Sequence, residues 1–263
     1  MKYHFAKLAA LALSTALPPV ANAQTPGFVH AELLPGWKTE SGSQMAALRV
    51  VLEDGWKTYW RTPGEAGIPP EFDWTGSRNI GLVTVHWPQP QVFDTYGIRT
   101  VGYANEMVLP IEVMPLDPAS GVWMAGEVSI GICHDICVPV TLDLEALLEG
   151  PGQADILIAR ALDARPASRP GTAHCTTEPV LDGVRVTAEI AMPPLGGKEV
   201  AVFELSGVPV WISDSTNHRQ GGVLIASTEI VPFDTSIHEI KRSDLTITVI
   251  GNGQAVEIIG CSG

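Results

Sequence analysis

Two cysteines separated by three residues, Cys133 and Cys137, are the residues of this sequence best suited to chemistry. A thiolate can attack a disulfide, so a close pair of cysteines can exchange electrons with another protein's thiols. The ring that joins them is small, and loop entropy predicts that it stabilises the fold by only about 2 kcal/mol. The pair is therefore a candidate redox couple.

The spacing of the pair constrains its local structure. Four residues of extended strand would separate the two Cα atoms by about 13 Å, whereas a disulfide requires about 4.4–6.8 Å. Residues 134–136 must therefore form a turn or a helical loop. Strand-like residues on both sides, 128–132 and 138–144, predict that this turn is the tip of a hairpin. Small rings of this kind tend to be strained, which makes a disulfide easier to reduce.

Two polar residues beside the pair are expected to modulate it. His134, as an imidazolium, would stabilise a thiolate and lower the thiol pKa, while Asp135 would act in the opposite direction. Either could instead be an ordinary polar turn residue. A structural disulfide is one alternative for the pair. Another is a copper or other soft-metal site formed with His134, but a closed metal site requires a fourth ligand, and none is evident.

The other two cysteines, Cys175 and Cys261, suggest a different role. Four cysteines allow three pairings, and pairing within each half of the chain avoids links across a flexible linker. A Cys175–Cys261 ring would be long and would stabilise its domain by about 4–5 kcal/mol. Cys175 is expected just before the first strand of that half and Cys261 just after the last strand. We therefore expect this second disulfide to be structural and inert.

The amino terminus indicates export. Residues 1–23 have a positive start with Lys2 and Lys7, a short apolar run at 8–17 and a small-residue cleavage site at 21–23, as in a secretory signal peptide. Export to the periplasm, if the source is a Gram-negative bacterium, would place the thiols where disulfides persist. No later stretch approaches the roughly 18 uninterrupted apolar residues of a membrane helix. We therefore expect a soluble periplasmic protein without membrane insertion.

Charge and motifs exclude several classes of protein. The net charge of −13 becomes −15 when Lys2 and Lys7 are removed with the signal peptide. Such an acidic chain, without basic clusters, argues against nucleic acid and anionic membranes as partners. The sequence contains no nucleophile elbow, no H-E-x-x-H and no phosphate-binding glycine-rich loop, which argues against hydrolases. Redox exchange by cysteines needs no cofactor, because the sulfurs carry the electrons.

The elements that must position these cysteines are predicted to be mainly strands. Turn signals separate short strand candidates in residues 24–150, at 46–52, 56–60, 83–87, 107–113 and 122–132. Residues 151–170 predict a short helix followed by a proline-containing linker. Residues 171–263 again alternate between apolar and polar residues, as at 184–190 and 245–249. The sequence therefore predicts an all-β protein of two β-sandwich domains joined by a short helix and linker.

Five segments of the first half together carry a family resemblance: Gly55–Arg61, Pro63–Pro69, Trp87–Pro88, Tyr103–Pro110 and Ile130–Pro139. They resemble the amino-terminal periplasmic domain of DsbD-type thiol:disulfide interchange proteins. The closer resemblance is to the ScsB branch, whose amino-terminal region carries a C-x-x-x-C pair and a second β-rich domain. The resemblance covers most of residues 35–145 and is weaker over 171–263.

This resemblance implies an immunoglobulin-like fold in which Cys133 and Cys137 are the redox couple of a protein-disulfide reductase. It implies two kinds of partner: a membrane-embedded or thioredoxin-like electron donor, and oxidised periplasmic client proteins. It also implies an aromatic cap over the couple, for which Phe93 and Tyr96 are the candidates. Both could instead be ordinary core or edge aromatics.

The sequence departs from the family in two respects. The DsbD couple has a wider spacing than three residues, and these 263 residues include neither a membrane domain nor a thioredoxin-like C-x-x-C domain. The electron source is then expected to be a separate protein, unless the redox function has been lost. The main alternative is a non-catalytic exported binding module in which both disulfides are structural.

Overall fold

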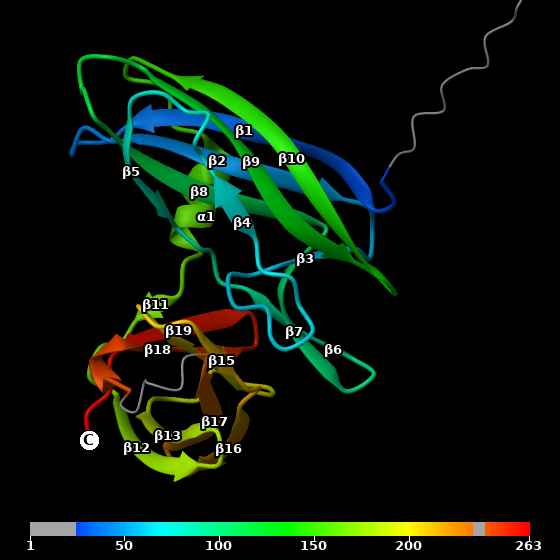
Figure 1. The fold of residues 1–263 in the computed structure, drawn as a ribbon, viewed down its shortest axis with the longest axis vertical. Coiled ribbons are helices and arrows are strands. Elements are labelled where there is room, and N and C mark those ends of the chain that lie inside the picture. Colours follow the sequence, from blue (N-terminus) through cyan, green and yellow to red (C-terminus); the bar gives the residue numbers. More distant parts are fainter. Residues whose placement is uncertain (1–24, 234–239) are drawn as a thin grey trace, which may run out of the picture.

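A computed structural model describes residues 25–233 and 240–263; the expected signal peptide, residues 1–23, lies outside them. The described chain forms two stacked lobes, which Figure 1 shows one above the other. The first lobe contains strands β1–β10 and helix α1, and the second contains strands β11–β19. The prediction of an all-β fold is confirmed. None of the helices in the described residues has the length and apolarity needed to cross a bilayer.

The first lobe is a sandwich of two sheets. One sheet has the order β1-β2-β8-β5, and the other has the order β10-β9-β3-β7-β6, with β4 paired to β9. All of these pairs are antiparallel. The apolar residues between the sheets include Leu48, Leu109 and Met124, each fully buried. The strands are β1 (Phe28–Lys38), β2 (Gln44–Leu52), β3 (Lys57–Tyr59), β4 (Glu71–Asp73), β5 (Ile80–Val85), β6 (Gln91–Thr95), β7 (Ile98–Ala104), β8 (Glu106–Pro115), β9 (Val122–Cys133) and β10 (Cys137–Leu148).

Helix α1 (Ile156–Asp163) covers the outer face of the first sheet. It begins where the Asp155 carboxylate accepts hydrogen bonds from the backbone N–H groups of the first turn, which satisfies donors that have no partner inside the helix. Ile158 then packs on Met45 and Ala47 of β2. Because the core covers the other face of β2, that strand is buried on both sides.

The second lobe is also built from two sheets. Their orders are β11-β19-β18-β14 and β12-β13-β17-β15, with β16 paired to β17, and they enclose a second buried cluster. A single 3₁₀ turn, η1 (Arg242–Asp244), precedes β18. The strands are β11 (Ala167–Ser168), β12 (Ala173–Val180), β13 (Gly183–Ala191), β14 (Val200–Leu205), β15 (Val210–Ile212), β16 (Thr216–Gln220), β17 (Val223–Pro232), β18 (Leu245–Gly251) and β19 (Gln254–Ile259).

The Cys175–Cys261 disulfide links β12 of one sheet to the segment that follows β19 of the other, with a Cα–Cα distance of 5.7 Å. Cys175 was expected just before the first strand of this half, and that placement is wrong. It lies inside β12, opposite Ala188, where its N–H donates to the carbonyl of Ser262. The strand begins earlier because Ala173 and Cys175 both turn inward, with an exposed residue between them.

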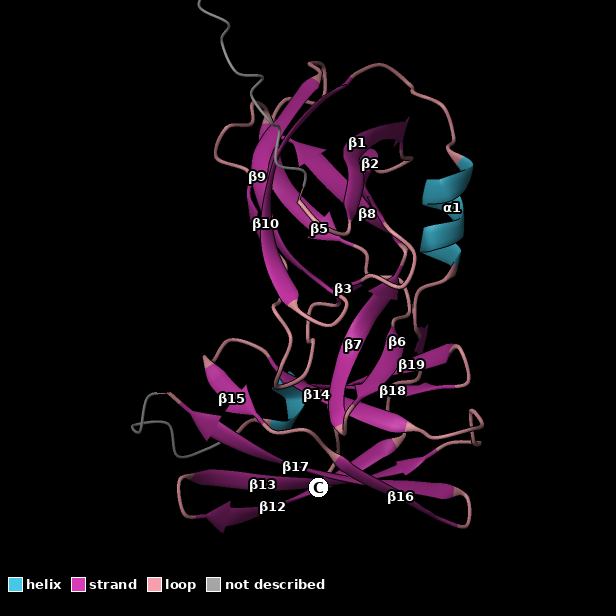
Figure 2. Cartoon of the chain, turned by 90° about the vertical axis from the view of Figure 1, so that its right-hand side faces the viewer, coloured by secondary structure: helices cyan, strands magenta, loops and turns pink. Residues whose placement is uncertain are grey.

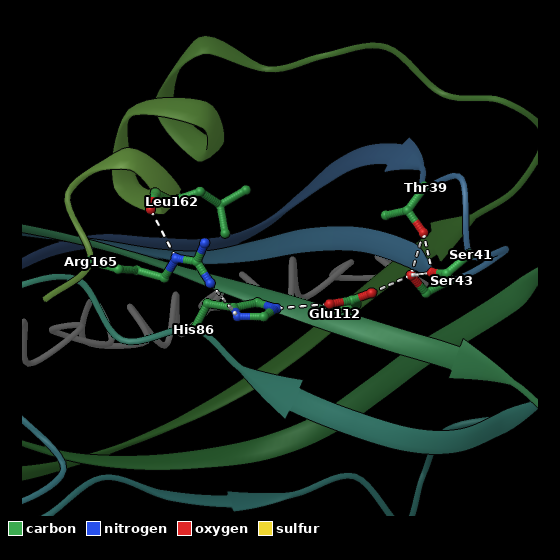
Figure 3. A network of polar contacts seen from close by, with 7 residues as sticks. All are labelled: Thr39, Ser41, Ser43, His86, Glu112, Leu162 and Arg165. Atoms are coloured by element: carbon green, nitrogen blue, oxygen red, sulfur yellow. Dashed lines mark hydrogen bonds and ion pairs between the residues drawn. The ribbon is translucent and has the colours of Figure 1, made fainter. Parts of the chain in front are cut away.

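A polar network ties the end of α1 to the first sheet (Figure 3). The Ser43 hydroxyl donates to Glu112 of β8 at 2.5 Å, and the other oxygen of Glu112 lies 2.9 Å from Nε2 of His86. Nδ1 of His86 lies 3.3 Å from a nitrogen of Arg165, which follows the helix. The pKa of Glu112 is held below its ordinary value, mainly by the hydrogen bond from Ser43. The hydrogen bond and charge of His86, and the charge of Arg165, lower it further.

This network predicts a pH-dependent contribution to stability. We expect Glu112→Gln to lower the free energy of unfolding at pH 7 by about 1.5–3 kcal/mol, because charge-assisted hydrogen bonds are lost. Because the pKa of Glu112 is lower in the folded than in the unfolded protein, its ionisation stabilises the fold at pH values above the unfolded-state pKa of about 4.3. This stabilisation disappears as the pH falls through the folded-state pKa. Urea unfolding of both proteins at pH 7 and pH 3 measures the difference. An equal difference at both pH values would contradict this account.

Candidate redox site

The Cys133–Cys137 disulfide closes the tip of the β9–β10 hairpin. Cys133 is the last residue of β9 and Cys137 the first of β10, and the two are Cα partners 4.2 Å apart. The backbone turns in three residues, within which the N–H of His134 donates to the carbonyl of Ile136. The tip lies at the end of the first lobe that is nearer to the second lobe (Figures 1 and 2). The hairpin therefore brings the Cα atoms of the two cysteines close enough for a disulfide.

The two sulfur-bearing residues differ in exposure. Cys133 is 1% exposed, whereas Cys137 is exposed, as is the whole turn between them. The side chain of Ile136, at 67% exposure, is the apolar part of this turn. A thiol–disulfide partner can therefore reach Cys137 directly but cannot reach Cys133 without a change in the hairpin.

Tyr59 of β3 contacts both sulfurs. Its hydroxyl oxygen lies 2.7 Å from Sγ of Cys133 and 3.1 Å from Sγ of Cys137. Neither sulfur of a disulfide carries a proton, so the tyrosine hydroxyl is the donor. Burial raises the pKa of Tyr59, which is 1% exposed, and so keeps this donor protonated. The site thus contains a fixed hydrogen-bond donor aimed at both sulfurs of the cysteine pair.

A glycine makes room for this tyrosine. Gly131 precedes Cys133 by two residues on β9 and therefore shares its face of the sheet. A Cβ atom at Gly131 would lie only 3.0 Å from the Tyr59 ring and 2.8 Å from the Cβ of Ile68. Because β3 pairs with β9, the absence of a side chain at 131 lets the ring lie across β9 and reach the sulfurs.

His134 and Asp135 lie on the exposed turn, as expected. Nδ1 of His134 is 3.0 Å from a carboxylate oxygen of Asp135, so the nearest charge to the imidazole is its own neighbour. The imidazole also lies beside the indole of Trp56, with ring centroids 6.0 Å apart. Their effect on the thiols stays a prediction.

The candidate cap residues lie on the β6–β7 hairpin. Phe93 is partly buried, and the ammonium of Lys57 lies 4.9 Å from the centre of its ring. Lys57 is the Cα partner of Cys133, so this cluster shares a face of the sheet with the couple. Tyr96 is 96% exposed at the hairpin turn. The cap stays a prediction for both rings.

The sequence interpretation did not assign a role to Tyr59, Gly131 or Trp56. Tyr59 and Trp56 lie in one of the segments that carry the family resemblance, but their proximity to the cysteines depends on the pairing of β3 with β9. The paired residues of these strands, such as Lys57 and Cys133, are more than 70 positions apart in sequence, and no local pattern reveals such a pairing. Among the residues that the structure describes, no group of three His, Cys, Asp or Glu side chains could hold a metal ion.

Fold and site together define an immunoglobulin-like β-sandwich domain that carries a cysteine pair at a hairpin tip, with Cys137 exposed and Cys133 buried. Residues 28–149 match the family described as "Thiol:disulfide interchange protein DsbD, N-terminal". This part of the chain is therefore similar to the amino-terminal domain of thiol:disulfide interchange proteins.

The solved structures extend the similarity to both lobes. The N-terminal periplasmic domain of ScsB from Proteus mirabilis aligns with a TM-score of 0.66 and 24% identity, over 88% of this chain and 92% of that one. This likeness shows a shared fold. A marsupial T cell receptor aligns with a TM-score of 0.18 and 11% identity, which is too low to indicate a common fold. No curated protein matches the sequence.

Proposed function

We propose that this chain is a periplasmic thiol–disulfide exchange protein in which Cys133 and Cys137 transfer electrons to oxidised client proteins. The observation that carries the proposal is the asymmetry of the couple. Cys137 is exposed on the hairpin, and Cys133 is buried with its sulfur 2.7 Å from the Tyr59 hydroxyl. An accessible sulfur is suited to forming a mixed disulfide, and a protected one is suited to resolving it.

The proposed reaction has two steps. The Cys137 thiolate attacks one sulfur of a client disulfide, which forms a Cys137–client bond and releases the other client thiolate. The Cys133 thiolate then attacks Sγ of Cys137, which forms the Cys133–Cys137 disulfide and releases the client's second thiol. The client gains two electrons and the couple loses two, so no further cofactor takes part.

The remaining parts of the proposal concern location and partners. The expected signal peptide, residues 1–23, and the likeness to a periplasmic domain support a periplasmic location. A membrane-embedded or thioredoxin-like electron donor would reduce the couple after each turnover. We propose the domain division 24–150, 151–170 and 171–263, in which only the first domain carries the redox couple.

In this reaction the role of Tyr59 is to stabilise the reduced couple. Its hydroxyl donates only weakly to the neutral sulfurs of a disulfide but strongly to a thiolate, because charge-assisted hydrogen bonds are about twice as strong as neutral ones. The hydrogen bond therefore favours the reduced state over the oxidised state and lowers the pKa of the thiol that receives it.

We expect Tyr59→Phe to make the couple about tenfold harder to reduce, because a hydrogen bond to a charged group stabilises by about 1.5–3 kcal/mol. The measurement is the equilibrium constant for reduction of Cys133–Cys137 by glutathione. The matched control is Tyr103→Phe, which removes a buried hydroxyl on neighbouring β7 that donates to the carbonyl of Pro88. Equal shifts in the two variants would assign the effect to packing and not to the sulfur contact.

The proposed function is tested by direct exchange. The reduced protein, with its second disulfide intact, is mixed with insulin as a surrogate client, and free thiols are counted by mass spectrometry after alkylation. We expect two electrons to leave Cys133 and Cys137 for each client disulfide reduced. A protein whose Cys133–Cys137 pair stays reduced in the presence of oxidised client would contradict the proposal.

A further inference from the structure

The two lobes are joined by an ion-pair cluster centred on Arg61. The Arg61 guanidinium donates two hydrogen bonds of 2.8 Å to Glu204 of β14 and one of 2.6 Å to Glu257 of β19. The hydroxyl of Thr62 adds a third bond to the Glu204 carboxylate. The three charged side chains are only 21–26% exposed. A bidentate pair of this kind fixes orientation as well as distance.

Apolar contacts accompany this cluster. The guanidinium of Arg61 lies 4.3 Å from the centre of the ring of Trp60, a residue with no exposed surface. Ile250 and Ala255 of the second lobe belong to the same buried cluster as the core of the first lobe. The interface is therefore continuous with the core of the redox lobe, and not a flexible tether.

The second lobe also holds the β6–β7 hairpin, which Figure 2 shows reaching down to it. Arg99 donates to the carbonyl of Ser215 at 3.0 Å, and Lys198 lies 3.5 Å from Asp94. Next to Arg99 on β7, the Thr100 hydroxyl accepts a hydrogen bond from Lys57, the Cα partner of Cys133. The neighbouring strand of the redox sheet is thus anchored to the same lobe.

The Arg61 ion pairs and the hairpin contacts both link the second lobe to the surroundings of β3, the strand that carries Tyr59. This strand has only three residues and lies between β9 and β7 in the sheet. Arg61 follows Tyr59 by two residues, and between them the N–H of Trp60 donates to Val101 of β7. A strand this short has little hydrogen bonding of its own, so its end is held by Arg61 and by its neighbours.

We propose that the second lobe is a positioning element for the redox couple: through Arg61 it holds β3 so that the Tyr59 hydroxyl stays aimed at the two sulfurs. This inference rests on the proposed function of Cys133 and Cys137 and adds to it a task for the second lobe. Arg61 is a positioning residue that acts through Tyr59 and touches neither sulfur itself.

A double-mutant cycle on the full chain tests the inference. Arg61→Met is made in the wild-type and in the Tyr59→Phe background, and the equilibrium constant for reduction by glutathione is measured for all four proteins. We expect Arg61→Met to disfavour reduction about threefold or more in the wild type and to have almost no effect once the Tyr59 hydroxyl is absent. Equal effects in both backgrounds, or none in either, would overturn the inference.

Two further variants keep the test decisive. Arg185→Met removes an exposed pair with Glu229 in the second lobe and should leave the equilibrium constant unchanged. If Arg61→Met does not fold, as judged by circular dichroism, Glu257→Gln removes the charge of one Arg61 partner and enters the same cycle with the same expected sign. A wild-type couple that glutathione and stronger dithiols cannot reduce would defeat the proposed function, whereas additive effects in a reducible couple would defeat only this inference.

Discussion

A Cys133→Ser variant is expected to accumulate a covalent complex with client proteins through Cys137, because the exposed thiol can still attack but its resolving partner is missing. A Cys137→Ser variant is expected to form almost no such complex, since the remaining thiol is 1% exposed in the folded protein. Both variants should lose catalytic client reduction, because each lacks one of the two sulfurs that must be joined.

The measurement is non-reducing electrophoresis and mass spectrometry of each reduced variant after mixing with insulin. Each variant is also tested after unfolding in urea, because the remaining thiols of the two variants are then equally accessible. We expect the two variants to react at similar rates when unfolded and at very different rates when folded. Preferential trapping through Cys133 in the folded protein would reverse the assigned order of attack.

Removal of the second disulfide is expected to have the largest effect on stability. Loop entropy predicts that a disulfide closing a loop of 86 residues stabilises the fold by about 4–5 kcal/mol. The double substitution Cys175→Ala/Cys261→Ala should therefore lower the free energy of unfolding of the second lobe by roughly that amount. Opening the 133–137 ring by the corresponding double alanine substitution should cost only about 2 kcal/mol. The contrast follows from loop length, since both pairs join residues that are already neighbours in the fold.

Urea unfolding monitored by tryptophan fluorescence measures this contrast. Trp211 is the only tryptophan in residues 171–263, so its signal reports on the second lobe, and a Trp211→Phe variant identifies that signal. The 175/261 variant should unfold at lower urea in the Trp211 signal. A larger loss from the 133/137 variant would contradict the division of the cysteines into a redox pair and a structural pair.

Sequence patterns predicted much of this fold because they act locally. Alternating residues at 184–190 and 245–249 lie in β13 and β18, and the short helix expected within 151–170 is observed at Ile156–Asp163. The hairpin around the cysteines followed from the short distance that a disulfide permits. The first strand, β1, was not predicted, because proline and glycine at positions 35 and 36 interrupt its pattern.

The surroundings of the couple could not be predicted in the same way. Tyr59 reaches the sulfurs only because β3 pairs with β9 and because position 131 has no side chain, and both conditions involve residues distant in sequence. The Arg61 cluster joins residues separated by more than 140 positions. Sequence alone indicates which side chains could do chemistry, while the sheet order determines which of them meet.

In the proposed function, the sulfurs of Cys133 and Cys137 alternate between disulfide and dithiol while those of Cys175 and Cys261 stay joined. A redox titration of the folded protein with glutathione and dithiothreitol tests this, with each cysteine alkylated and quantified by mass spectrometry. We expect the 133–137 pair to have a reduction potential well above −300 mV and the 175–261 pair to have one below about −300 mV, as structural disulfides do. A 133–137 pair that stays oxidised to the same limit as the 175–261 pair would contradict the proposed function and favour a binding module with two structural disulfides.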